Sequence, residues 1–371
     1  MNPKHSKTLG PTALLLAALA LAACGEGGGL TDQTPPPPDD PPDDGGEPPA
    51  PNVEGYTIYA VTLDNRLLLF GSENPGTIAR TVNISGLPFL NRIVGLDFRP
   101  SNGKLYGVGN DSRVYTLDPA TGVATPVSPT RFEPHIFGFF DVHFGMGFDP
   151  VTERIRLIAA ESGMNWSIGP DDGVAVRGKD VSYAAGDPNE GHKPAILGLA
   201  YTPPGAATAR AGSLRGLSAR LGPQDLCEDL MWAIDAELAE IIGSCDPDEG
   251  DFTSLGPLQG IAGVGLVFNC GEVKFDPEGN LYAAVLWRDH TLKLRVSLFR
   301  IDPETGELTK LRDLPDVSPI QALAFDFTVP FQPALRPKPA AASLSLAPAA
   351  AGGVPAPPGS GELASCAGES R

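Results

Sequence analysis

The sequence predicts an all-β fold, a single β-propeller of about five four-stranded blades. Three observations predict it. Residues 95–127 read as four short strands in a row, degenerate copies of this unit recur at intervals of about 50 residues, and the strand missing from the first copy reappears after the last. A repeat of this length and strand content is typical of propeller blades, each of which is one four-stranded sheet.

The unit at residues 95–127 is the most regular copy. Its expected strands have the sequences GLDF, KLYGVG, RVYTLD and ATPV, and the turn signals PSNG, GND and DPATG separate them. In such turns Asp caps the bend, Pro presets φ at about −65° and Gly accepts positive φ. We therefore expect the strands to be joined by hairpins.

Each copy opens with a strand that ends in an aromatic residue. These aromatic residues are Phe98, Phe148, Tyr201, Phe275 and Phe325, at intervals of 50, 53, 74 and 50 residues. The enlarged interval contains residues 204–225, a small, polar and basic-leaning stretch that predicts a long loop. The spacing predicts five blades, or six if the connection 179–194 contains further strands.

The first unit, residues 56–87, contains only three expected strands and lacks the aromatic opening strand. Residues 320–327 supply an unpaired copy of that strand at the other end of the repeat region. Pairing the two completes the first blade and removes an exposed sheet edge. The sequence therefore predicts a ring that is closed by its C-terminal strand.

The turn motif Asp-Pro-x-x-Gly recurs at residues 118–122 and 302–306, with looser versions at 169–173 and 246–250. Its acidic residues do not follow the alternating ligand spacing of an EF-hand calcium loop. We interpret the motif as a structural turn. The acidic run at 225–251 has ten acidic and no basic side chains, and we favour a solvated surface there over a rim that binds a cation or a partner.

The N-terminus predicts export and lipidation. Lys4 and Lys7 precede the apolar stretch 13–20, which has the length expected of a signal peptide. The segment 21–24, Leu-Ala-Ala-Cys, resembles the lipobox of bacterial lipoproteins, in which the signal is cut before a cysteine that becomes lipidated. We expect residues 1–23 to be a signal peptide and Cys24 to carry acyl chains; the alternative is an ordinary signal peptide with a chance cysteine. Gly25, in place of Asp, resembles lipoproteins that are sorted to the outer membrane.

Two low-complexity segments flank the expected head at residues 53–330. Residues 24–52 are rich in Pro and Asp, with seven acidic and no basic side chains, and residues 331–371 are rich in Pro and Ala. Both lack the apolar content needed to offset the entropy of ordering, so we expect an extended stalk and a disordered tail. The formal net charge of −18 at pH 7 argues against nucleic acid as a partner.

The cysteines left after export have neither C-x-x-C nor zinc spacing. Cys227 and Cys245 flank the second and third strands expected in the fourth blade, so we predict a disulfide between them. Cys270 either pairs with Cys366 or stays buried.

The sequence predicts no catalytic residue, no cofactor and no metal ligand. The histidines expected in the head (His135, His143, His192 and His290) are scattered singly. The column before the aromatic residues is mostly small (Asp97, Gly147, Ala200, Lys274 and Ala324). The column after them contains three aspartates that precede turns, where Asp commonly caps (Arg99, Asp149, Thr202, Asp276 and Asp326).

Several segments together resemble one bacterial family, the domain of unknown function 4394. The matching segments are 59–67, 93–100, 104–107, 116–122 and 182–189, in order, and the resemblance extends over residues 56–327. It implies a secreted or lipid-anchored propeller without an assigned activity. The chain departs from the family pattern at residues 204–225 and at the cysteines of the fourth blade.

Two hypotheses of function follow. The first is a non-catalytic head that binds or scaffolds a protein or glycan partner in the cell envelope, held by its lipid anchor to the membrane, which we expect to be the outer membrane. The second is a metal-dependent hydrolase or lactonase of the propeller type, acting in the periplasm or at the cell surface. The anchor, the stalk and the repeat favour the first hypothesis, because the recurring residues are those of strands and turns.

Overall fold

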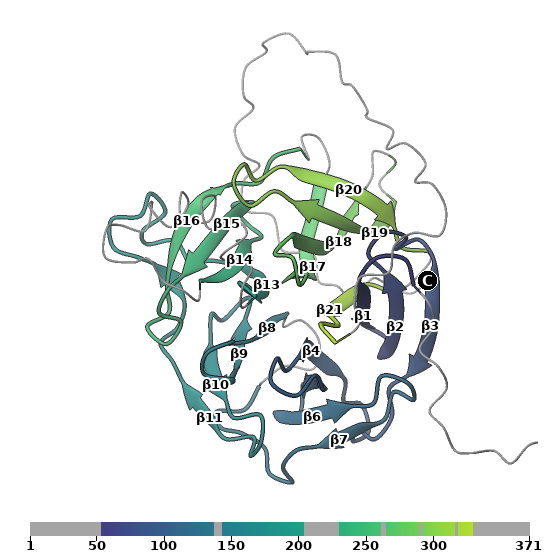
Figure 1. Cartoon of the computed structure of the whole chain (residues 1–371). Coiled ribbons are helices and arrows are strands. Elements are labelled where there is room, and N and C mark those ends of the chain that lie inside the picture. Colours follow the sequence, from purple (N-terminus) through teal and green to yellow (C-terminus); the bar gives the residue numbers. More distant parts are fainter. Residues whose placement is uncertain are drawn as a thin grey trace, which may run out of the picture. The chain divides into compact units, whose positions relative to one another are not determined.

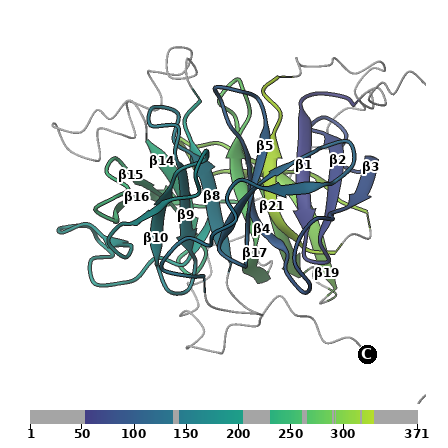
Figure 2. The same ribbon diagram turned by 90° about the horizontal axis from the view of Figure 1, so that it is seen from below.

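The computed structural model describes residues 53–136, 143–203, 230–260, 265–288, 291, 293–315 and 318–328. These residues form five antiparallel sheets arranged in a ring, a five-bladed β-propeller (Figure 1). Figure 2 shows the ring from the side, with β1, β2 and β3 next to one another at one edge and β14, β15 and β16 at the other. Within the described residues, no helix is long and apolar enough to cross a bilayer.

The strands of each blade follow one another from the centre of the ring outward. Blade 1 consists of β21 (Ile320–Phe325), β1 (Thr57–Thr62), β2 (Arg66–Gly71) and β3 (Ile78–Asn83). Blade 2 consists of β4 (Ile93–Phe98), β5 (Leu105–Gly109), β6 (Arg113–Leu117) and β7 (Ala124–Pro126). Blade 3 consists of β8 (Phe144–Phe148), β9 (Ile155–Ala159), β10 (Asn165–Ile168) and β11 (Ala175–Arg177). Blade 4 consists of β13 (Ile196–Tyr201), β14 (Met231–Asp235), β15 (Glu240–Ser244), β16 (Asp251–Pro257) and the added β12 (Ser182–Tyr183). Blade 5 consists of β17 (Gly265–Phe275), β18 (Leu281–Arg288), β19 (Leu294–Ile301) and β20 (Leu308–Asp313).

The blade count and the closure confirm the prediction from the repeat. The connection 179–194 contributes only β12, which pairs in parallel with β16, so it extends blade 4 instead of forming a sixth blade. β21 pairs antiparallel with β1, opposing Phe325 to Ile58 and Ala324 to Tyr59. β21 is buried along its whole length. Its pairing with β1 therefore leaves blade 1 without an exposed inner edge.

The column of aromatic residues forms the packing between blades. In four of the five inner strands, the terminal aromatic ring packs against an aromatic ring on the second strand of the preceding blade, with centroids 5.1–5.8 Å apart. Such pairs add about 0.5–1.5 kcal/mol each beyond the burial of their area. The four pairs are Phe98–Tyr59, Phe148–Tyr106, Phe275–Trp232 and Phe325–Tyr282.

The Asp-Pro-x-x-Gly turns also join neighbouring blades, a role beyond the hairpins that the sequence predicts. Gly122 lies against the end of β3, with Ser85 N donating to Gly122 O at 3.0 Å. Gly306 lies in the same way against the end of β16, with Gln259 N donating to Gly306 O at 2.7 Å. Because the backbones approach so closely, these positions have room only for glycine.

Replacing Gly306 with alanine is expected to lower the free energy of unfolding by about 2–4 kcal/mol. Gly306 has φ of 73°, and a Cβ atom there would lie 2.1 Å from Pro257 O. Urea denaturation of the purified chain measures the loss. Gly186→Ala is the matched control, because it shares a positive φ of 82° but its Cβ would meet no atom within 4 Å. Equal losses in the two variants would contradict a role for Gly306 in joining the blades.

Both ends of the described head lie at the end of the ring where the inner strands finish. Asp326 N donates to Thr57 O at 3.0 Å, which joins the exit of β21 to the entry of β1. Val53 packs in the same core cluster as Phe98. The chain therefore enters and leaves the propeller on one face.

Candidate functional site

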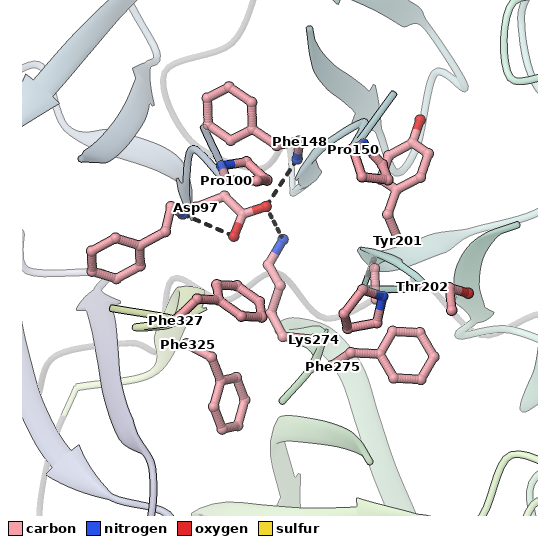
Figure 3. A pocket seen from close by; sticks show the side chains of 13 residues that line it. Asp97, Pro100, Phe148, Pro150, Tyr201, Thr202, Lys274, Phe275, Phe325 and Phe327 are labelled. Carbon is pink, nitrogen blue, oxygen red and sulfur yellow. Dashed lines mark hydrogen bonds and ion pairs between the residues drawn. The ribbon is translucent and has the colours of Figure 1, made fainter. Parts of the chain in front are cut away.

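A pocket with a cavity volume of about 40 Å³ opens at this same end of the central channel (Figure 3). The residues two places after four of the five aromatics form much of its rim, which we call the mouth collar: Pro100, Pro150, Pro203 and Phe327. Asp97 and Lys274 lie among the collar residues, with their charged ends pointing toward each other. A cavity of this size holds roughly two to four water molecules. It is therefore a small, mostly apolar site with two charged groups.

Lys274 connects four blades at the level of this pocket. From β17 its Nζ lies 3.5 Å from Asp97 Oδ2 on β4, and it donates to Leu199 O on β13 at 2.9 Å and to Met146 O on β8. The lysine is only 4% exposed. A buried charge is tolerated only when it is paired and hydrogen-bonded, and these three acceptors meet that requirement.

Asp97 is held in place from its own blade and the next. Its Oδ1 accepts from Phe98 N at 3.0 Å and its Oδ2 accepts from Phe148 N at 2.9 Å. Burial raises the pKa of the Asp97 carboxyl, while the Lys274 ammonium and the two backbone donors oppose that rise. The ion pair therefore joins strands β4, β8, β13 and β17 across the channel.

The small residues in this column make the arrangement possible. Gly147, Ala200 and Ala324 occupy the same position in the other three inner strands, so their side chains leave the channel free for the long side chain of Lys274. From the sequence, the column is recognisable only as mostly small. Nothing local shows that its two charged members meet, because they are 177 residues apart (274 − 97).

Glu272 is a third channel residue, and sequence reasoning missed it. It is fully buried, its Oε1 accepts from Leu199 N at 2.8 Å and from Val273 N at 3.2 Å, and its Oε2 has no hydrogen-bond partner among the described residues. Gly198 provides the space, because a Cβ there would lie 2.4 Å from Glu272 Oε1. The available signal was that Glu272 is the charged member of an otherwise small column, whose other members are Gly95, Gly145, Gly198 and Ala322.

Burial raises the pKa of Glu272 to about 8, although the Lys274 charge acts in the opposite direction. The channel thus contains the carboxyl groups of Asp97 and Glu272 and the ammonium group of Lys274. Their total charge is zero when one of the two carboxyl groups is protonated. Because the folded pKa lies above the ordinary glutamate value of 4.5, the folded state binds this proton more tightly than the unfolded chain does. By linkage, Glu272 lowers the free energy of unfolding progressively as the pH rises from about 4.5 to about 8.

Glu272→Gln is expected to become more stable than the wild type as the pH rises. A neutral amide keeps an acceptor for Leu199 N and has no charge to bury, so the gain should reach on the order of 3–5 kcal/mol at pH 8 and above and vanish below about pH 4.5. Thermal denaturation from about pH 4 to pH 9 measures it. The exposed Glu278→Gln serves as the control and should follow the wild-type profile. A gap between Glu272→Gln and wild type that stays constant with pH would show that Glu272 is already ionised in the folded protein.

The three aspartates after the aromatic column cap turns, as predicted. Oδ1 of Asp149 accepts from the backbone of Val151 and Thr152. Asp276 and Asp326 bind their own turns in the same way. Arg99, the basic residue in that column, pairs with Glu153 at 2.8 Å. Over the described part of the chain, no group of three or more His, Cys, Asp or Glu side chains is placed to hold a metal ion.

The remaining predicted residues lie away from the pocket or outside the described residues. Cys245 follows β15 and is disulfide-bonded, whereas Cys227 lies outside the described residues, so the pairing of the two stays a prediction. His135 and His192 precede inner strands and lie near Glu133 and Glu237 respectively. Cys24, the stalk, the loop 204–225, His290, Cys366 and the tail are also outside the described residues.

Comparisons with known proteins give one family and three solved structures of low similarity. The family model described as domain of unknown function (DUF4394) matches residues 66–324. No curated protein matches the sequence.

Three solved structures are similar to this chain at low identity. One is the crystal structure of a nidogen/laminin complex, with 12% identity over 74% of this chain and 98% of that chain, at a TM-score of 0.41. A putative 6-phosphogluconolactonase from Bacteroides uniformis has 14% identity over 71% of this chain and 84% of that chain, at a TM-score of 0.36. A protein of unknown function from Bacteroides thetaiotaomicron has 13% identity over 74% of this chain and 63% of that chain, at a TM-score of 0.42. At TM-scores below 0.5, none of these likenesses supports a functional assignment.

Proposed function

The chain belongs to the DUF4394 family, and from that premise we propose that its propeller is a non-catalytic binding head of the bacterial cell envelope. The head engages a protein or glycan partner at the mouth collar. A lipid on Cys24 anchors it, at the outer membrane, and the acidic stalk separates it from the bilayer.

The observation that carries this proposal is the combination of an apolar collar with charged groups that already satisfy one another. The Lys274 ammonium has three acceptors within the protein, and Asp97 accepts two backbone hydrogen bonds besides the ion pair. We therefore assign these groups a structural role, which is to hold the inner strands together, and not a catalytic one. The rim instead offers proline and aromatic surface, which suits the faces of sugar rings and extended peptides.

Capture from envelope material tests the binding function. The mature full-length chain, solubilised in detergent and immobilised, is exposed to envelope extract and to a glycan array. We expect saturable binding to at least one component, reduced at least tenfold by Phe327→Asp, which places a charge in the collar at an exposed position. Phe89→Asp, at an exposed loop outside the pocket lining, is the matched control and should bind like the wild type.

Two outcomes would overturn the proposal. One is equal binding by the wild type and Phe327→Asp. The other is turnover of an ester or lactone by a preparation that contains stoichiometric metal, which would establish the hydrolase instead. Palmitate labelling of the wild type but not of Cys24→Ser tests the anchor separately.

A further inference from the structure

The chain leaves the propeller along the edge of the pocket. After β21 ends at Phe325, the backbone N and Oγ1 of Thr328 donate to Asp326 Oδ1 at 2.8 and 2.6 Å, so the exit is a defined turn. Within it, Phe327 is 42% exposed and lines the pocket. The methyl group of Thr328 lies against Gly103, where a Cβ atom would come within 2.5 Å. The chain thus passes from blade 1 toward the turn of blade 2 that carries Pro100.

The sequence that follows has the chemistry of a ligand for such a collar. Thr328 is followed by 43 residues (371 − 328), and the first eleven are VPFQPALRPKP. This segment has four prolines, three large apolar side chains, two basic residues and no acidic residue. Proline-rich segments adopt the polyproline helix at about 3.1 Å per residue and dock on aromatic-lined surfaces, so eleven residues extend to about 34 Å.

Charge distinguishes this segment from the other proline-rich segment of the chain. The described turns around the mouth contain more acidic than basic side chains, and the acidic ones are Asp149, Glu153, Asp276, Glu278 and Asp326, against Arg99, Lys104 and Arg154. The stalk 25–52 has seven acidic residues and no basic one, so the mouth repels it. Arg336 and Lys338 give the C-terminal segment the complementary sign.

We propose that residues 329–339 dock across the mouth collar in an extended, polyproline-like conformation. Phe331 is three residues beyond Thr328, which places it within reach of Pro100 and Phe327. Because the segment is covalently attached, its effective concentration at the collar is in the millimolar range, so a site with a dissociation constant below about 1 mM is occupied most of the time.

Photo-crosslinking in the full-length mature chain tests this inference. With p-benzoylphenylalanine in place of Phe331, irradiation is expected to give intramolecular crosslinks to peptides that contain Pro100, Pro150 or Pro203, identified by mass spectrometry. The same group in place of Ala356 is the matched control and should give at least fivefold fewer of these crosslinks. Arg336→Glu with Lys338→Glu should reduce the crosslinks from position 331 at least fivefold.

Four outcomes would overturn the inference. They are equal crosslinking from positions 331 and 356, crosslinks from 331 that avoid the collar, crosslinks between two molecules of the chain, and crosslinks to the collar from the same group placed at Pro42 in the stalk. None of these readouts requires an external partner. A failure of the docking inference therefore leaves the proposed binding function open to its own test.

Discussion

Replacing Lys274 with methionine is expected to lower the free energy of unfolding by about 3–5 kcal/mol, the usual cost of removing one partner from a buried ion pair. Methionine fills a similar volume but leaves Asp97 as an uncompensated buried charge. It also leaves Leu199 O and Met146 O, which now accept from Nζ, without that donor. Guanidinium denaturation, followed by the fluorescence of the buried Trp166 and Trp232, measures the loss.

Two further variants make the result specific to the ion pair. Asp97→Asn combined with Lys274→Met removes both charges, so the double variant should recover part of the stability that Lys274→Met loses. Lys179→Met removes an exposed lysine paired with Glu249 and should leave the denaturation midpoint unchanged. If Lys274→Met proved as stable as the wild type, the ion pair between Lys274 and Asp97 would not stabilise the packing of the inner strands.

Ending the chain after Ser318, which deletes β21, is expected to abolish cooperative folding. β21 supplies Leu323 and Phe325, both fully buried, and Ile320, which is almost so. At about 1.5–3 kcal/mol for each such side chain, the loss is on the order of 5–9 kcal/mol before the broken strand pairing with β1 is counted. That equals much of the total stability of a typical domain. Near-ultraviolet circular dichroism and a denaturation curve report the loss of fixed packing.

The matched control ends the chain after Thr328, which removes only residues 329–371 and keeps β21. It should retain the cooperative transition of the full-length chain. A folded, cooperative variant that lacks β21 would show that blade 1 is stable without its inner strand and that closure is not needed for the ring.

The repeat made the architecture predictable because each blade repeats the same local chemistry. Strands end at the same aromatic position and turns use the same Asp, Pro and Gly, so the strand order could be derived without knowing any contact. The missing first strand and the orphan last one likewise required a closed ring, and the pairing of β1 with β21 confirms it. The three aspartates were correctly interpreted as turn caps, since the atoms that they bind lie within four residues.

The site was much less predictable, because its members come from different blades. Lys274 was visible in the sequence only as one of five residues at a repeated position, and Glu272 was not singled out at all. The role of Gly306 in joining two blades was hidden in the same way, because its turn is locally a complete hairpin and the contact with Pro257 is decided by how neighbouring blades pack.

By itself, then, the sequence determined the all-β propeller, the number of blades and their closure, because periodicity and turn chemistry act over a few residues. Only the tertiary structure decided that Asp97 and Lys274 meet across the channel and that Glu272 is buried beside Gly198. It also showed that the chain enters and leaves the head at the face that bears the pocket. The physical reason is that a ring brings its inner strands together around one axis, so residues as far apart in sequence as Asp97 and Lys274, which are 177 positions apart (274 − 97), become neighbours through packing that no local pattern encodes.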